Sequence, residues 1–154
     1  MELEQHVFLP NPLVVVAHSA HRLAGRASIQ LSMLAKHRFI LRERGSGTRM
    51  ACDAHFAALG FQPDVRLELG SNEAIKHSVA AGLGLAILSR HALGPRADGG
   101  GVTELKVRGF PVQSHWFILH PKDRTPSPIA IEFLAHLRAS AKQLTASISG
   151  SMRT

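Results

Sequence analysis

The positions of hydrophobic and polar residues change period several times along the middle of the chain. Residues 38–42 and 84–88 are short apolar runs, and residues 64–69 alternate between polar and apolar, so all three segments suit strands. The stretches between them repeat apolar residues at helical spacing, and each ends at a glycine. The pattern therefore predicts strand, helix, strand, helix and strand across residues 38–88, which is typical of a parallel sheet with packed helices.

Each of these two helices has a predicted apolar face that should cover the sheet. The first helix is expected to open at Ser46 or Thr48 and to end near Leu59, and the second to run from Glu73 to Ala81. At helical spacing, the apolar face of the first helix consists of Met50, Ala54, Ala57 and Ala58. That of the second helix consists of Ile75 and Val79.

The flanking segments predict further elements. Strands are expected at 13–17, 102–108 and 114–120, a short helix at 28–36 and a longer helix at 128–145. The longer helix has an apolar stripe at Ile129, Phe133 and Leu137. Residues 146–154 are expected to form a flexible tail.

Composition narrows the class of protein. The chain has 154 residues, enough for one domain or two small lobes. Its apolar runs are far shorter than the roughly 20 residues that span a bilayer, and residues 1–5 do not open a signal peptide. A single cysteine excludes an intrachain disulfide and fits a reducing compartment. A soluble, cytoplasmic protein is therefore expected.

The formal net charge of +7 favours anionic partners. The basic residues are scattered, however, and one tryptophan with no tyrosine offers little aromatic surface for stacking on bases. A solvated basic surface is therefore favoured over direct binding to nucleic acid.

Two strand-to-helix junctions carry the candidate chemistry. The carboxyl ends of parallel strands meet at one edge of a sheet, where ligands bind in open α/β folds. The first junction, residues 42–49, contains Arg42, Arg44 and Arg49, and the second is residues 70–73. Glycine and short polar side chains line both junctions: Ser46, Gly47, Thr48, Ser71 and Asn72. Backbone N–H groups at the helix starts, together with an arginine, predict binding of a small carboxylate or phosphate.

The same residues also fit a purely structural role. Serine, threonine and asparagine are common N-caps, and glycine is common in tight turns. Either junction alone therefore fits a helix cap as well as a ligand site. Their position on one edge, with arginine in the first, makes ligand binding as well supported as a purely structural role.

Other chemistries have little support. Gly45 and Gly47 begin like a dinucleotide fingerprint, but Met50 stands where the third glycine belongs, so no cofactor is expected. The ten histidines lack a metal-binding spacing, and His115 and His120 would face opposite sides of one strand, so no metal site is expected. The cysteine lies among alanines, as a packed thiol does. No catalytic arrangement remains, and an enzyme is not expected.

Several motifs together resemble a known family. The segments are FILRERGSGTRMACDAHF (39–56), LELGSNEAIKHSVAAGLGLAILSRHAL (67–93) and NPLVVVAHSAHRLAG (11–25). They resemble the effector-binding domain of LysR-type transcriptional regulators, over about residues 6–140. Arg22 and Arg44 stand where that family usually has proline. Residues 105–138 are most similar to the subgroup that regulates carbon-dioxide-fixation operons.

The resemblance implies a fold like the type II periplasmic binding proteins, a Rossmann-like α/β lobe plus an incomplete second lobe. On this mapping residues 18–90 form a complete second lobe. Residues 1–17 and 91–145 form a partial first lobe with the crossover strands. The family's helix-turn-helix DNA-binding domain is absent from this chain, and so is roughly the first third of its effector domain.

The resemblance also implies a function and a site. The chain would sense a small anionic metabolite, phosphorylated or carboxylated, between its lobes and transmit binding through oligomer geometry. Family ligand contacts map onto three places: Ala17 and His18; Arg42, Ser46, Gly47 and Thr48; Ser71 and Asn72. A homodimer or higher oligomer is expected, with DNA reached only through the absent domain and no membrane partner. The alternatives are a stand-alone small-molecule-binding module and a truncated dimerisation fragment without ligand.

Overall fold

The computed structural model describes residues 2–94 and 100–151, with side chains described up to residue 145. The chain divides into two compact units. The larger unit is Pro12–Ser114, and the smaller unit combines Met1–Asn11 with His115–Thr154. In the described residues no helix is both long and apolar enough to cross a membrane.

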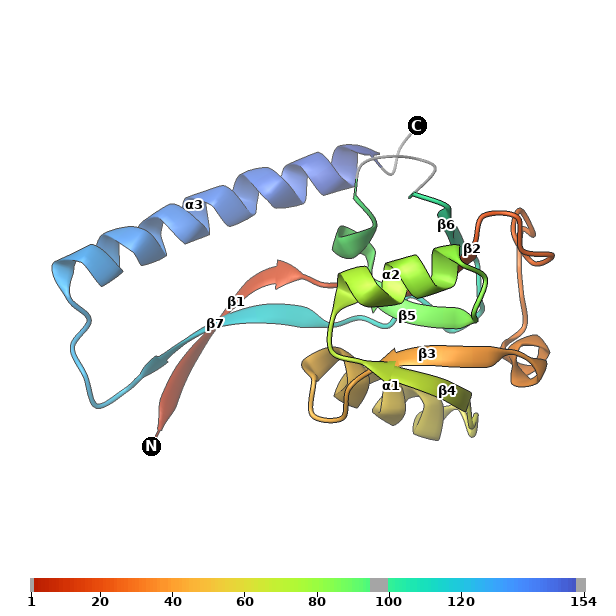
Figure 1. Cartoon of the computed structure of the whole chain (residues 1–154). Helices are drawn as coiled ribbons and strands as arrows, with labels where there is room; N and C mark the ends of the chain where they lie inside the picture. The colour runs from red at the N-terminus through yellow and green to blue at the C-terminus, as the bar shows by residue number, and fades with distance from the viewer. Residues whose placement is uncertain (1, 95–99, 152–154) are drawn as a thin grey trace. The chain divides into compact units, whose positions relative to one another are not determined.

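The larger unit is built on a five-stranded mixed sheet (Figure 1). Its strands are β2 (Leu13–His18), β3 (Arg38–Arg42), β4 (Asp64–Leu69), β5 (Leu85–Ser89) and β6 (Val102–Leu105). They lie in the order β4-β3-β5-β2-β6. β3 is parallel to both β4 and β5, whereas β2 is antiparallel to β5 and β6. The parallel arrangement predicted for residues 38–88 is confirmed, and two antiparallel strands extend it.

Two helices cover opposite faces of this sheet (Figure 1). They are α1 (Gly47–Ala58) and α2 (Asn72–Ala80), and the short 3-10 helices η1 (Leu31–Lys36) and η2 (Arg90–Leu93) lie in the connections. Leu13, Val15 and Ala17 of β2 share a core with Cys52 and Phe56 of α1. The alternate β2 residues, Val14 and Val16, share a second core with Ile75 and Val79 of α2. β2 is therefore apolar at successive positions because both of its faces are buried.

The predicted face of α1 is wrong, whereas that of α2 is confirmed. Met50 is 63% exposed, and the three alanines assigned to that face are exposed too. Cys52 and Phe56 are buried instead. The Phe56 ring packs edge-on against Phe39 of β3 with the centroids 6.0 Å apart. One phenyl ring removes more apolar area from water than several alanines, so the helix turns toward it.

The smaller unit pairs β1 (Leu3–Pro10) with β7 (His115–Pro121) in an antiparallel ladder and adds α3 (Pro128–Ser151). The sequence patterns predicted β7 and α3 but missed β1. α3 runs beyond the predicted end at 145, so residues 146–151 continue the helix rather than forming a tail, and residues 152–154 lie outside the described part. Its predicted stripe is mostly wrong, because Ile129 is 83% and Phe133 59% exposed. Of the predicted stripe only Leu137 is half-buried, and Ala130 and Leu134 are half-buried with it.

The boundary between the units differs from the predicted one. Residues 12–17 and 91–114 were assigned to the first lobe, but they group with the larger unit. The reason is hydrogen bonding, since β2 lies between β5 and β6 in the larger sheet. The predicted strand 102–108 ends at Leu105, before a bend that contains the cis peptide Phe110-Pro111.

Candidate anion-binding site

The two strand-to-helix junctions lie side by side in the larger unit. β3 and β4 are parallel neighbours, and Arg42 at the end of β3 pairs with Leu69 at the end of β4. Both strands therefore end at the same edge of the sheet. The backbone N–H of Glu43 donates to the carbonyl of Leu69 at 3.2 Å and extends this pairing into the first loop. The starts of α1 and α2 consequently lie at one edge, as expected for a ligand-binding α/β fold.

Both predicted serines act as helix caps. The Ser46 hydroxyl accepts a hydrogen bond from the N–H of Arg49 at 3.0 Å, and the Ser71 hydroxyl accepts one from the N–H of Ala74 at 3.4 Å. Capping leaves the N–H groups of Gly47 and Thr48, in the first turn of α1, without acceptors inside the helix. These groups and the positive end of the helix dipole provide the site's donors for an anion.

Arg42 joins the two junctions. Its Nη1 group donates to Oδ1 of Asn72 at 3.1 Å, so the end of β3 is tied to the first residue of α2. Its Nε and Nη2 groups donate to the two carboxylate oxygens of Glu43 at 2.8 and 3.0 Å. These hydrogen bonds raise the pKa of Arg42 and lower that of Glu43. A ligand that uses Arg42 must share the guanidinium with Glu43 or displace that carboxylate.

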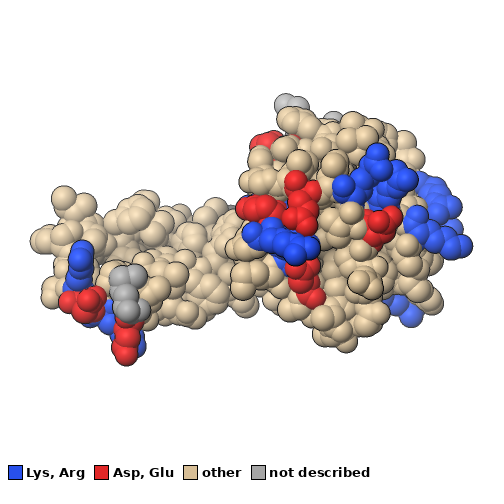
Figure 2. Space-filling model, turned by 60° about the horizontal axis from the view of Figure 1, so that its bottom comes forward, with Lys and Arg blue, Asp and Glu red and all other residues tan. Residues whose placement is uncertain are grey.

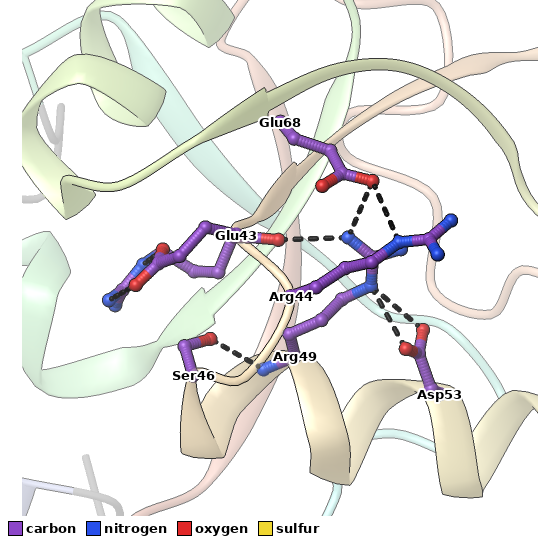
Figure 3. A network of polar contacts seen from close by, with 7 residues as sticks. Glu43, Arg44, Ser46, Arg49, Asp53 and Glu68 are labelled. Carbon is purple, nitrogen blue, oxygen red and sulfur yellow. Dashed lines mark hydrogen bonds and ion pairs between the residues drawn. The ribbon is translucent and has the colours of Figure 1, made fainter.

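Arg49 has a structural role (Figure 3). Its side chain is only 8% exposed. It donates from Nε to both oxygens of Asp53 at 3.0 Å and from Nη1 to the carbonyl of Arg42 at 2.9 Å. It also pairs with Glu68 at 3.2 Å. Burial lowers the pKa of Arg49, and the hydrogen bonds with Asp53 and Glu68 more than offset that effect.

The net charge at this edge is close to balanced. Arg44 is 84% exposed and approaches Glu68 at 3.6 Å, so it is the most accessible of the three arginines. Three acidic side chains accompany the three arginines: Glu43, Asp53 and Glu68. In Figure 2 one group of acidic and basic side chains lies together near the middle of the view, while further basic side chains gather at its right. Specific donors, rather than an excess of positive charge, therefore distinguish this edge.

Ala17 and His18 lie at the opposite edge of the sheet. β2 runs antiparallel to β5, so Leu13 pairs with Ser89 at the edge of the two junctions and His18 lies five residues further along. At about 3.3 Å per residue this separates His18 from that edge by roughly 16 Å. Ala17 is fully buried, and His18 borders a different hollow of about 320 Å³. One small ligand cannot contact these two residues and the junctions within this unit.

The thiol of Cys52 is buried and unreactive. Cys52 is 2% exposed, and burial raises its pKa to about 12. A thiol of this kind is protonated at neutral pH and is a poor nucleophile.

The sequence pattern indicated the two junctions, but it did not indicate the acidic side chains that pair with Arg42 and Arg49. The spacing of Arg49 and Asp53, one helical turn apart, was a readable signal for an ion pair. The pairing of Glu68 with Arg49 was not readable, because it depends on the register of β3 against β4.

This α/β lobe, with two helix starts at one sheet edge, has the fold of the type II periplasmic-binding-protein-like ligand-binding domains. Residues 1–142 match the family described as LysR substrate binding domain, and the chain belongs to this family. The expected fold class is thus confirmed.

Relatives among characterised proteins fall in the expected subgroup. The chain is 43% identical over 132 residues to the HTH-type transcriptional activator CmpR of Synechocystis, covering 86% of this chain and 43% of the relative. It is 40% identical over 141 residues to a RuBisCO operon transcriptional regulator of Acidithiobacillus ferrooxidans, covering 92% and 46%. The chain therefore spans less than half the length of these relatives, which are transcriptional regulators rather than enzymes.

Solved structures of related domains have the same fold as this chain. The regulatory domain of CcmR from Synechocystis, in complex with 2-PG (2-phosphoglycolate), superposes with a TM-score of 0.86 at 40% identity, covering 92% of this chain and 68% of that one. The effector binding domain of QuiR in complex with shikimate superposes with a TM-score of 0.78 at 22% identity, covering 92% and 66%. The second likeness supports the fold alone.

Proposed function

We propose that this chain is the effector-sensing part of a LysR-family transcriptional regulator and binds a small phosphorylated or carboxylated metabolite. The proposed contacts are Arg42, Ser46, Gly47, Thr48, Ser71 and Asn72. The observation that carries the proposal is the 3.1 Å hydrogen bond from Arg42 to Asn72, which ties the end of β3, just before the loop into α1, to the first residue of α2.

The chemistry of the junctions supports this ligand class. Two helix N-termini and a guanidinium lie at one sheet edge. Such N–H donors are suited to phosphate or carboxylate oxygens. The CcmR regulatory domain, 40% identical, has been solved with 2-phosphoglycolate, which carries both groups. That compound is the first ligand to test.

Sensing would work by population shift. A metabolite that binds one arrangement of the regulator more tightly favours that arrangement, and oligomer geometry on DNA follows. In this proposal the chain acts in the cytoplasm as part of a homo-oligomer, and another part of the regulator contacts DNA. No chemical step takes place.

The test is a titration of the purified chain with 2-phosphoglycolate, followed by thermal unfolding and by calorimetry. Binding to the folded state raises the melting temperature by mass action. Arg42→Ala should abolish the shift. Arg66→Ala, which removes an exposed arginine from β4, should keep it and so controls for lost charge. Each variant is compared with its own ligand-free melt.

Two results would contradict the proposal. The first is that the wild-type chain melts cooperatively but its melting temperature is unchanged by 2-phosphoglycolate and by every other phosphate and carboxylate tested. The chain would then fold without binding a ligand of this class. A shift that survives Arg42→Ala would place the ligand elsewhere.

A further inference from the structure

We infer that Glu4, His6 and His120 of the smaller unit form a binding site for a divalent transition metal such as Zn²⁺. Each residue offers one ligand atom, and the three atoms lie within 4.8 Å of one another. All three lie on one face of the β1–β7 ladder, because Glu4 pairs directly with His120 and His6 follows Glu4 by two residues. Two imidazoles and one carboxylate are a ligand set that zinc commonly takes.

The observed distances fit a tetrahedral metal. Metal–ligand bonds of about 2.0–2.1 Å place neighbouring ligand atoms about 3.3 Å apart. Here Nε2 of His6 lies 3.2 Å from Oε1 of Glu4, and Nε2 of His120 lies 3.7 Å from Oε2 of the same carboxylate. The two imidazole rings also stack on each other with centroids 5.6 Å apart, and the Nε2 atom of each lies next to a different oxygen of the Glu4 carboxylate. Small side-chain rotations would complete three corners of the tetrahedron.

The orientation of His120 suits a metal ligand. Its Nδ1 lies 3.2 Å from the backbone carbonyl of Pro121, which accepts a hydrogen bond when that nitrogen carries the proton. The lone pair then resides on Nε2, the atom that faces Glu4. A backbone carbonyl behind a ligating histidine is the usual outer partner in metal sites.

The site is accessible and has room for a fourth ligand. Glu4 is exposed, and both histidines are half-buried. His6 also borders a groove of about 930 Å³ with Arg138 and Lys142 on its far wall. Glu4 offsets part of the metal's charge, and water is the expected fourth ligand.

Spacing along the sequence could not have found this site. His115 and His120 indeed lie at odd spacing on β7, and only His120 joins the cluster. The other members come from β1, which the hydrophobic pattern did not reveal.

The test uses tag-free chain stripped with a chelator and titrated with ZnCl₂ against a chromophoric competitor. One Zn²⁺ per chain is expected. Affinity should fall at least tenfold in His6→Ala and in His120→Ala. His77→Ala, which removes an exposed histidine from α2 in the larger unit, should bind as the wild type does. Circular dichroism melts verify that each variant folds.

A second readout reports geometry. Co²⁺ bound in place of Zn²⁺ should give the intense visible absorption of a tetrahedral site, which His120→Ala should lose. The inference is overturned if wild-type chain binds no Zn²⁺, if His6→Ala and His120→Ala bind as tightly as wild type, or if His77→Ala weakens binding equally. Anion binding at the junctions does not depend on the outcome, so the two proposals can fail separately.

Discussion

Arg49 shows that a basic residue in a candidate anion site can be held by hydrogen bonds and ion pairs within the protein itself. It links α1, the end of β3 and the side chain of Glu68. Arg49→Met keeps most of the side-chain volume but loses these charge-assisted hydrogen bonds. The free energy of unfolding should fall by about 2 kcal/mol, measured by urea denaturation.

Arg66→Met is the matched control for Arg49, because Arg66 is exposed on β4. Its effect should stay within about 0.5 kcal/mol. Equal effects of the two substitutions would mean that the Arg49 network contributes nothing to stability.

The lowered pKa of Glu43 should make the stability of the protein depend on pH. The hydrogen bond from Arg42 holds the pKa of Glu43 below its ordinary value of 4.5. A carboxyl group whose pKa is depressed on folding stabilises the protein above its unfolded pKa, and this contribution is lost as pH falls through the folded pKa. The difference in melting temperature between wild type and Glu43→Gln should therefore be present near neutral pH and shrink below about pH 4.5. A difference that stays constant down to about pH 3 would contradict this account.

At the scale of elements, the two faces of α1 give a direct test of its orientation. Phe56 is 2% exposed against Phe39, whereas Met50 is 63% exposed. Phe56→Ala should cost about 3–5 kcal/mol, because it leaves a cavity in a packed core. Met50→Ala should stay within about 0.5 kcal/mol. Chemical denaturation of both variants measures these losses in the free energy of unfolding. A larger loss in Met50→Ala than in Phe56→Ala would support the face predicted from the sequence instead.

Gly84 tests the contact between β5 and β3. A Cβ at this position would lie 2.6 Å from the backbone carbonyl oxygen of Arg38. Backbone cannot yield as a flexible side chain does, so Gly84→Ala should destabilise the larger unit by more than about 2 kcal/mol. At Gly47 an added Cβ meets no atom within 4 Å, and Gly47→Ala should leave stability unchanged or slightly higher. Similar melting temperatures for the two variants would show that the strands can separate at little cost.

Local pattern predicted the elements of the larger unit better than their contacts. β3 and β4 were predicted residue for residue, since β3 is a short apolar run and β4 alternates between polar and apolar residues. β1 was missed because Glu4, Gln5 and His6 interrupt its apolar residues, and the pairing with β7 rather than the local pattern makes it a strand. The junctions were found because helix starts and strand ends are local. The link from Arg42 to Asn72 depends on two loops far apart in the sequence.

At the scale of the whole molecule, we expect copies of the chain to associate through the smaller unit. Large apolar side chains are exposed on one face of its two-stranded sheet: Leu3, Val7, Phe117 and Leu119. Exposed apolar patches of this kind mark interaction surfaces. Sedimentation velocity should show concentration-dependent association of the chain.

The double variant Val7→Thr, Leu119→Thr should shift that association toward monomer. Leu83→Ser is the control, because Leu83 is 46% exposed in the larger unit. Association that persists in the double variant, or is lost in the control, would place the contact elsewhere.

The strand order of the larger sheet has a consequence for how the protein is made. β2 leaves the ribosome before its sheet partners β5 and β6, which follow only after β3 and β4. β3, α1, β4, α2 and β5 can assemble through contacts close in sequence, whereas β2 must wait for partners distant in the chain. Until then its five buried residues, Leu13–Ala17, are exposed to water as one apolar run. During synthesis this segment is therefore open to chaperones and to misassociation.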